Sequence, residues 1–123
     1  MKTNRKIYYA HFSGIYNTHQ EKRDINLLKT LFPEDEIINP NQFIHQENSK
    51  KLEKPMVYFE NLVKSCDIIA FRGCVNGKIG AGVFKEIEVA SELGLPVIEL
   101  PSLLDRQMTV SETRLMLQEL GVR

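Results

Sequence analysis

Short apolar runs alternate with segments of helical periodicity along most of the chain. The apolar runs, which are rich in residues that favour β-structure, lie at 6–10, 36–38, 67–71 and 95–100. The segments with apolar residues at helical spacing lie at about 19–31, 55–63, 83–93 and 111–120. This order predicts strands that alternate with helices from one end of the chain to the other.

The alternation predicts one α/β domain over residues 1–123. Strands separated by helices pair in parallel through right-handed βαβ units, which places helices on both faces of the sheet. The run at 67–71 is apolar on both faces after its first residue, as expected for a central strand. We therefore expect a three-layer, doubly wound, flavodoxin- or Rossmann-like fold with a parallel sheet of four to five strands.

One carboxylate lies on the apolar face of the helix predicted at 83–93. Successive helical residues are about 100° apart around the axis, so Val83, Ile87 and Ala90 share a face. Glu86 falls in the same arc, roughly 60° from Val83. Because a charged group stays near apolar surroundings only when it is paired, hydrogen-bonded or functional, Glu86 is either a cap or salt bridge at the rim of the sheet or an active-site carboxylate. We take the second interpretation as the working hypothesis.

The stretch 42–55 is polar and rich in charged residues. It is longer than an ordinary connection in a small α/β domain. We expect it to form a mobile lid or an extra helical turn, or else an exposed surface loop.

The charge balance and the composition limit the classes of partner that we expect for this chain. The chain has 16 Lys and Arg against 16 Asp and Glu, so its formal net charge is zero, which argues against bulk nucleic acid as a partner. Its apolar runs are shorter than a membrane span, and the start of the chain lacks the apolar region of a signal peptide. Cys66 and Cys74 do not have metal-ligand spacing and are expected to be free thiols. We therefore expect a cytoplasmic protein with no membrane, metal or cofactor.

The carboxyl ends of the predicted strands are where an open parallel sheet binds ligands. The residues that follow these strands or precede the Glu86 helix are small or polar, which suits a small polar ligand better than a protein partner. The candidates for substrate contact are His11, Ser13, Gly14, Asn39, Gly80 and Gly82.

The glycines before the Glu86 helix have two interpretations. Gly80 and Gly82 allow backbone N–H groups to approach a ligand, the helix N-terminus favours an anion, and Lys78 adds charge for a phosphate. The loop lacks the Gly-Lys-Ser/Thr of a P-loop, and it does not follow the first strand as a dinucleotide fingerprint does. Tight turns also need glycines, so a purely structural role stays open.

From Tyr8 to Leu100 the chain resembles the nucleoside 2-deoxyribosyltransferase family, including its relatives that hydrolyse deoxynucleoside monophosphates. The specific segment is 82–90, read as GVFKEIEVA, followed by 94–98, read as GLPVI. It is similar to the family's glycine, nucleophilic glutamate and alanine with a later Gly-x-Pro-Val entry to the next strand. The segments CDII at 66–69 and IYY at 7–9 are similar to two of the family's strands.

The resemblance implies roles for individual residues. Glu86 matches the nucleophile, Tyr8 the tyrosine beside it with Tyr9 as second choice, and Asp67 an aspartate of the site. The implied reaction is N-glycosidic cleavage or (deoxy)ribosyl transfer on a nucleoside or nucleotide, through an intermediate that water or another base resolves. The helix N-terminus favours ionised Glu86 while partial burial opposes it, and we expect the first effect to dominate.

Two departures from the family pattern keep an alternative open. Gly80 stands where the family's transferases carry an aspartate that holds the base, and Glu88 stands where they carry a glycine. Related sensor domains bind nucleotide-like ligands without chemistry, so the alternative is a non-catalytic nucleotide-binding sensor. Family relatives complete their sites across subunit contacts, so we expect a homo-oligomer, a dimer or higher, with the helix at 111–120 as a candidate contact.

Overall fold

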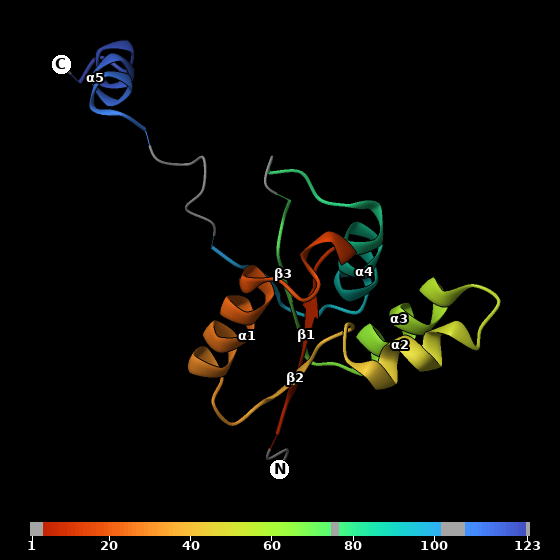
Figure 1. The fold of residues 1–123 in the computed structure, drawn as a ribbon. Helices are drawn as coiled ribbons and strands as arrows, with labels where there is room; N and C mark the ends of the chain where they lie inside the picture. The colour runs from red at the N-terminus through yellow and green to blue at the C-terminus, as the bar shows by residue number, and fades with distance from the viewer. Residues whose placement is uncertain (1–3, 75–76, 102–107, 123) are drawn as a thin grey trace.

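A parallel sheet organises the chain, of which the computed structural model describes residues 4–74, 77–101 and 108–122. The strands are β1 (Lys6–Ala10), β2 (Glu36–Ile38), β3 (Ile68–Phe71) and β4 (Val97–Glu99). They pair in parallel in the order β2-β1-β3-β4 (Figure 1). This arrangement confirms the predicted flavodoxin- or Rossmann-like α/β fold, with a four-stranded sheet in the described residues.

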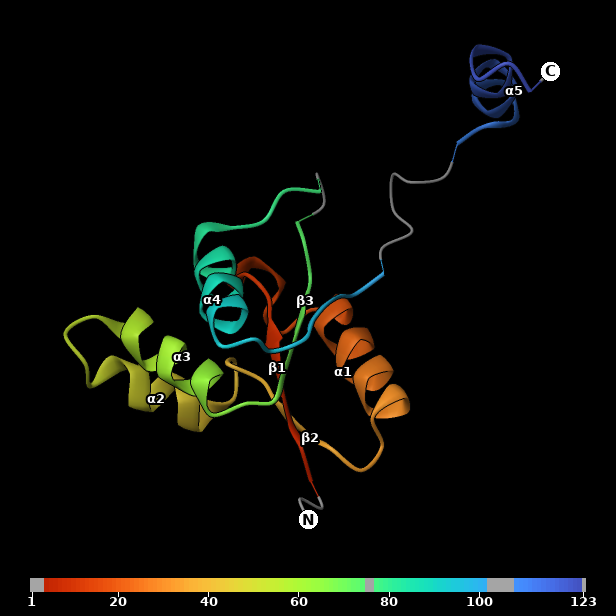
Figure 2. The same ribbon diagram turned by 180° about the vertical axis from the view of Figure 1, so that it is seen from behind.

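Helices cover both faces of this sheet. The helices of the described residues are α1 (His19–Leu31), α2 (Phe43–Lys50), α3 (Pro55–Lys64), α4 (Ala81–Glu92) and α5 (Val110–Glu119), with a short 3-10 helix, η1 (Ser13–Ile15), after β1, and all but α5 pack near the sheet. Figures 1 and 2 show α1 on one side of the strands and α3 and α4 on the other. Among the described residues, no helix is long and apolar enough to cross a membrane.

Local sequence signals set several helix ends. The Thr18 hydroxyl accepts a hydrogen bond from the Glu21 N–H and caps the start of α1. Pro55 occupies the first turn of α3, where a missing N–H does no harm. Gly94 follows α4 with a φ of 73°, the left-handed conformation that ends helices and that glycine adopts most readily.

The core lies in two layers because side chains alternate along β1. Tyr8 and Ala10 pack with Val63 of α3 and with α4, whereas Ile7 and Tyr9 pack with Leu28 of α1. The side chains of one short strand therefore hold both helical layers to the sheet.

Helix boundaries differ from the prediction at three places. Residues Phe43–Lys50 of the polar stretch form a helix, which confirms the expectation of added helix and shows that these residues are not an irregular loop. Helix α4 begins at Ala81, two residues earlier than predicted, with Gly80 as its N-cap. Helix α5 begins at Val110, one residue earlier than predicted, and is capped by Thr109 in a capping box with Glu112.

Helix α5 presents apolar side chains that have no cover. None of its described residues is buried, and the helix stands away from the sheet in both views (Figures 1 and 2). Leu115 and Leu120, which were expected to pack, are 57% and 68% exposed. The described residues of the chain therefore do not supply the packing partner that this helix was expected to have.

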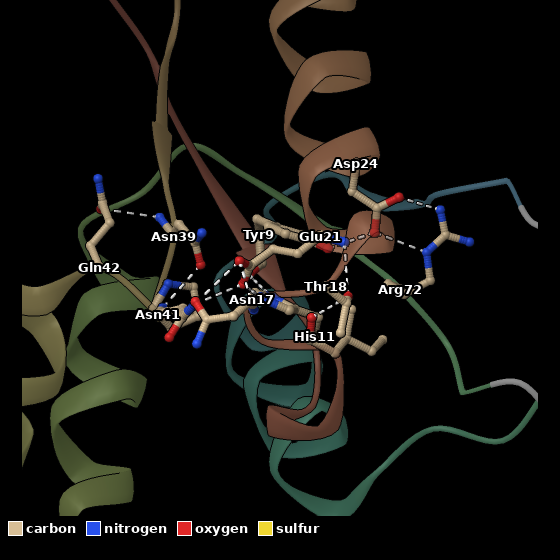
Figure 3. A network of polar contacts seen from close by, with 12 residues as sticks. Tyr9, His11, Asn17, Thr18, Glu21, Asp24, Asn39, Asn41, Gln42 and Arg72 are labelled. Carbon is tan, nitrogen blue, oxygen red and sulfur yellow. Dashed lines mark hydrogen bonds and ion pairs between the residues drawn. The ribbon is translucent and has the colours of Figure 1, made fainter.

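A buried ion pair ties α1 to the end of β3. Arg72 and Asp24 are both buried, and the Arg72 Nε donates to an Asp24 carboxylate oxygen at 3.0 Å (Figure 3). The Tyr9 hydroxyl donates to the same carboxylate at 2.5 Å, and Arg72 also donates to the carbonyl of Pro101 at 2.8 Å. The carboxylate thus has several donors, as a buried charge requires.

Replacing Arg72 by Met should lower the free energy of unfolding by about 3–5 kcal/mol, because Asp24 then stays buried without its countercharge. Urea denaturation measures the loss. Arg23→Met, at an exposed position of the same region in α1, is the matched control and should change stability by less than about 0.5 kcal/mol. Equal effects of the two substitutions would contradict a special role for the buried pair.

Candidate functional site

A cavity of about 290 Å³ lies at the carboxyl ends of β1 and β2, bordered by η1, α3 and α4. His11, Ser13, Gly80, Gly82 and Glu86 line it, and all five were predicted to belong to the site. They come together because the ends of parallel strands and the start of the following helix meet at one edge of the sheet.

Glu86 contributes a buried carboxylate to this cavity. It lies on the face of α4 that packs on the sheet, and the residue is only 6% exposed, as the helical pattern predicted. Its Oε2 accepts a hydrogen bond from the Tyr8 hydroxyl. Burial raises the pKa of Glu86 to about 7, while the hydrogen bond from Tyr8 lowers it and the charge of Glu60 raises it further. The acid therefore titrates near neutral pH.

This pKa corrects the expectation that the helix N-terminus would dominate. Because α4 begins at Ala81, Glu86 lies beyond the first turn, which contains no acidic residue. The electrostatic benefit of a helix N-terminus is confined to about one turn. Desolvation therefore has the larger effect on the ionisation of Glu86.

Tyr8 lies under Glu86, and Tyr9 lies on the opposite face of the sheet. Burial and the nearby Glu86 raise the pKa of Tyr8 well above its usual value, so its hydroxyl remains a hydrogen-bond donor. Tyr9 points into the α1 layer and donates to Asp24. The alternation of side chains along β1 thus selects Tyr8, and not the second-choice Tyr9, as the neighbour of Glu86.

His11 forms part of the cavity wall, yet both of its ring nitrogens are engaged away from a ligand. Its Nδ1 lies 3.1 Å from the carbonyl oxygen of Tyr9, and its Nε2 lies 2.8 Å from Glu21 Oε2. The imidazole ring stacks on the Tyr9 ring with 3.8 Å between ring centroids, and it is tilted against the Tyr16 ring with 4.9 Å between centroids. Burial lowers the pKa of His11, and the hydrogen bonds to Glu21 and Tyr9 oppose that change. His11 is therefore a rigid wall residue.

Glu21 joins two segments of the cavity rim, and sequence reasoning missed it. Besides His11, its carboxylate accepts the Asn17 N–H at 3.1 Å and the Asn41 side-chain amide at 3.1 Å (Figure 3). These hydrogen bonds, with burial acting against them, lower the pKa of Glu21. Phe12, Ser13 and Tyr16 lie between His11 and Asn17, so Glu21 fixes the stretch that carries them. The signal in the sequence was an acid in the first turn of the predicted helix, three residues after Thr18.

Apolar and aromatic side chains complete the cavity, and most of them were not predicted to contact a ligand. These residues are Phe12, Tyr16, Pro40, Met56 and Phe59. Met56 and Phe59 had been assigned to the packing stripe of α3, and the same stripe extends from the core into the cavity. Burial raises the pKa of Tyr16 to about 12, with smaller contributions from the charges of Glu86 and Glu21.

Some predicted residues lie elsewhere. Asp67 precedes β3 at the amino end of the sheet, where its Oδ2 accepts the Lys6 N–H at 2.8 Å, so the structure does not bring it to the cavity. Asn39 accepts the Asn41 N–H at 2.9 Å and supports the rim without lining the cavity. Gly14 faces the Phe12 ring so closely that a Cβ there would be 2.3 Å from a ring carbon. Its role is to admit that ring.

The cavity offers a ligand few polar groups. These are the Glu86 carboxylate, the hydroxyls of Ser13 and Tyr16, and the backbone N–H groups at the start of α4. Lys78, expected to add charge for a phosphate, is exposed and does not line the cavity. In the described part of the chain, no three His, Cys, Asp or Glu side chains are grouped to hold a metal ion.

Comparison with known proteins shows the fold. No protein-family model matches the sequence, and no curated protein matches it either. The chain is similar to the crystal structure of a conserved protein from Enterococcus faecalis, with a TM-score of 0.62 and 22% identity. The match covers 94% of this chain and 75% of that one, and it supports the same α/β architecture.

Replacing Glu86 by Gln should stabilise the protein at pH 8 by up to about 3 kcal/mol and have a much smaller effect near pH 4.5. The folded protein binds the Glu86 proton more tightly than the unfolded chain, so wild type loses stability as pH rises through about 7. Gln keeps an oxygen that accepts from Tyr8 but cannot ionise. Chemical denaturation across pH 4.5–8 measures the effect.

The control for this prediction is Glu88→Gln, which removes an exposed carboxylate from the same helix. Wild type and Glu86→Gln with parallel stability curves across this pH range would show that Glu86 ionises normally.

Proposed function

We propose that the chain cleaves the N-glycosidic bond of a nucleoside or nucleotide, by hydrolysis or by (deoxy)ribosyl transfer, with Glu86 as the nucleophile. The observation that supports this function is a buried carboxylate in a cavity wall, hydrogen-bonded from behind by Tyr8. The cavity, at about 290 Å³, lies near the lower end of the range for small-molecule pockets, which suits a nucleoside-sized ligand. The resemblance to nucleoside 2-deoxyribosyltransferases, centred on residues 82–90, agrees with this assignment.

In the proposed reaction the C1′–N bond breaks and its electron pair leaves on the base. Positive charge develops on the sugar, and the Glu86 carboxylate stabilises that charge or forms an ester to C1′. Water then attacks C1′, Glu86 departs as a carboxylate, and the proton of the water passes to the base or to solvent. A second base in place of water gives transfer of the sugar.

Tyr8 has a positioning role in this scheme. Its hydroxyl donates to the oxygen of Glu86 and so supports the ionised form that the reaction needs. The carboxylate retains a second oxygen for the sugar. Because burial holds the pKa of Glu86 at about 7, the nucleophile is available in growing proportion as pH rises to neutrality.

A non-catalytic nucleotide sensor is the second candidate function. It is favoured by Gly80, which borders the cavity without a side chain at the position where the family's transferases hold the base. The two functions differ in turnover and not in binding, so the same ligands test both.

We also propose that the protein acts as a homo-oligomer in the cytoplasm. Exposed apolar residues of α5, including Val110 and Leu115, and the C-cap residue Leu120 support the first part, because an isolated helix of this length is marginal in water and gains stability from packing. Cys66 and Cys74 are free thiols in the described residues, in keeping with a reducing compartment.

Release of free base from a panel of nucleosides and their monophosphates, followed by chromatography, tests the catalytic function. Glu86→Ala should lower kcat/KM by at least about 10³-fold, as expected for loss of a nucleophile. Glu88→Ala, which removes an exposed carboxylate of the same helix, should keep the wild-type rate. For wild type, kcat/KM should rise about tenfold per pH unit below 7 and level off above it.

Three results of this assay have distinct meanings. Equal base release by wild type and Glu86→Ala would end the nucleophile assignment. Ligand-induced thermal stabilisation without turnover would favour the sensor. Neither turnover nor stabilisation with any nucleoside or nucleotide would exclude both functions.

Size-exclusion chromatography with light scattering tests the oligomer. Wild type should elute as a dimer or larger, and Leu120→Glu should shift it to monomer, because a charge in an apolar contact is unfavourable. Gln118→Glu, on the same helix, controls for charge alone. Because α5 adds no buried residue to the core, both variants should keep the fold, and a monomeric wild type would refute the proposal.

A further inference from the structure

The cavity combines aromatic walls with one buried carboxylate. Phe12, Tyr16 and Phe59 bring three aromatic rings to its lining, and Met56 adds a polarisable sulfur. Glu86 lies among them with little access to water. Aromatic rings attract cations through the negative charge of their faces, and sites that recognise quaternary ammonium groups combine several such rings. The lining thus resembles a receptor for a flat, positively charged group.

Two of the side chains that could give a proton near Glu86, Tyr8 and His11, are committed to partners within the protein. The Tyr8 hydroxyl donates to Glu86 itself, and the two nitrogens of His11 are directed to Tyr9 and Glu21. Tyr16, with a pKa of about 12, holds its proton tightly. Glu86 cannot donate a proton and attack C1′ in the same state. The described residues of the cavity therefore favour a leaving group that needs no proton.

A positively charged aglycone is such a leaving group. When the C1′–N bond of an N-ribosylpyridinium or an N7-alkylpurine breaks, the electron pair neutralises the ring nitrogen, and the base departs as a neutral molecule. A neutral purine or pyrimidine would depart as an anion unless an acid protonated it. Water supplies the hydroxyl group of the sugar product, and its remaining proton passes to solvent.

We propose that this cavity selects N-glycosides whose aglycone is a cationic heteroaromatic ring, held by the aromatic walls and by the Glu86 carboxylate. The inference rests on the proposed function for the reaction, but the recognition of the cation stands on the geometry of the cavity. It names a substrate class that the resemblance alone does not indicate.

The charge of the ligand also affects the ionisation of Glu86. A cation bound beside a buried acid stabilises the ionised form, because opposite charges attract strongly where water is excluded. A cationic substrate would thus increase the fraction of enzyme with an active carboxylate, whereas a neutral substrate would not. Binding and activation of the nucleophile are then two consequences of the same charge.

Binding of 1-methylnicotinamide, a pyridinium cation, against nicotinamide, its neutral counterpart, tests the inference without any bond cleavage. The two probes differ by one methyl group and one charge. At pH 8, isothermal titration of the wild-type protein should show about tenfold tighter binding of the cation. Glu86→Gln should reduce that ratio severalfold, since it removes the charge and keeps the shape, and the aromatic rings should account for the preference that remains.

Two further variants separate the aromatic walls from general packing. Phe59→Leu keeps apolar volume but removes a ring from the cavity, so it should weaken binding of the cation more than binding of nicotinamide. Phe43→Leu, at a 79% exposed position of α2, is the matched control and should leave both affinities unchanged. Equal affinity for the two probes, tighter binding of nicotinamide, a preference of the same size in Glu86→Gln as in wild type, or no binding of either probe would each overturn the inference.

Hydrolysis of 7-methylguanosine against guanosine separates this inference from the proposed function. Rates are divided by the spontaneous rate of each compound and compared with those of Glu86→Gln. A larger enhancement for the methylated, cationic nucleoside supports the inference. Cleavage of guanosine with no advantage for 7-methylguanosine overturns it and leaves the proposed function intact. Cation binding with no cleavage of any N-glycoside removes the proposed function and leaves a cation-binding site.

Discussion

The hydrogen bond between Tyr8 and Glu86 is the interaction on which the proposed function depends. It joins the central strand β1 to α4 through groups that are almost wholly buried. A carboxylate at that depth loses most of its hydration, and one strong donor offsets only part of the loss. Val83, Val89 and Ala90 pack the same face of α4 into the core, and this apolar contact keeps Glu86 in a position that it would otherwise leave. The apolar packing of α4 in the core therefore offsets the cost of keeping a partly ionised acid in the cavity wall.

The opposite face of β1 carries a second polar cluster with a different task. Tyr9 donates to Asp24, and the pair of Asp24 with Arg72 links α1 to the end of β3. Glu21, one turn earlier on α1, reaches across to His11 and to the loop after β2. In this cluster nearly every donor meets an acceptor, so it stabilises one arrangement of the rim without offering groups to a ligand. One face of the strand thus supports the carboxylate of the cavity, and the other holds the rim in place.

The sequence was sufficient for those features that a repeating pattern encodes. Parallel pairing of the strands follows from alternating βαβ units, and the burial of Glu86 follows from its angle on α4. The edge of the sheet that holds the cavity follows from a general rule for parallel sheets. The placement of Asp67 at the opposite edge also follows from its position before β3, yet the resemblance to a family assigned it to the site. There, topology was the better guide.

Other features depend on contacts between distant segments, which one sequence does not reveal. Helix α2 has few apolar residues, and its packing against α3 becomes apparent only in three dimensions. The network around Glu21 joins residues of two loops and a helix, and no local spacing marks it. Phe59 belongs to an ordinary amphipathic stripe, and whether such a ring meets the core or a cavity is decided by where α4 lies. The expectation that Glu86 is readily ionised was wrong for a related reason, because the depth at which a side chain is buried depends on the whole fold.

Burial, ionisation and ligand charge are linked in this cavity. The desolvation that raises the pKa of Glu86 to about 7 also makes the carboxylate responsive to any charge that enters. An exposed acid would be fully ionised at neutral pH and screened by water, so it would distinguish little between a charged and an uncharged ring. A buried acid beside Phe12, Tyr16 and Phe59 is only partly ionised at neutral pH in the absence of a ligand. A bound cation excludes water from the cavity, and its positive charge stabilises the carboxylate in place of that water. Within the proposed function, the partial ionisation of Glu86 before a ligand binds is therefore the source of the selectivity for a cationic ring.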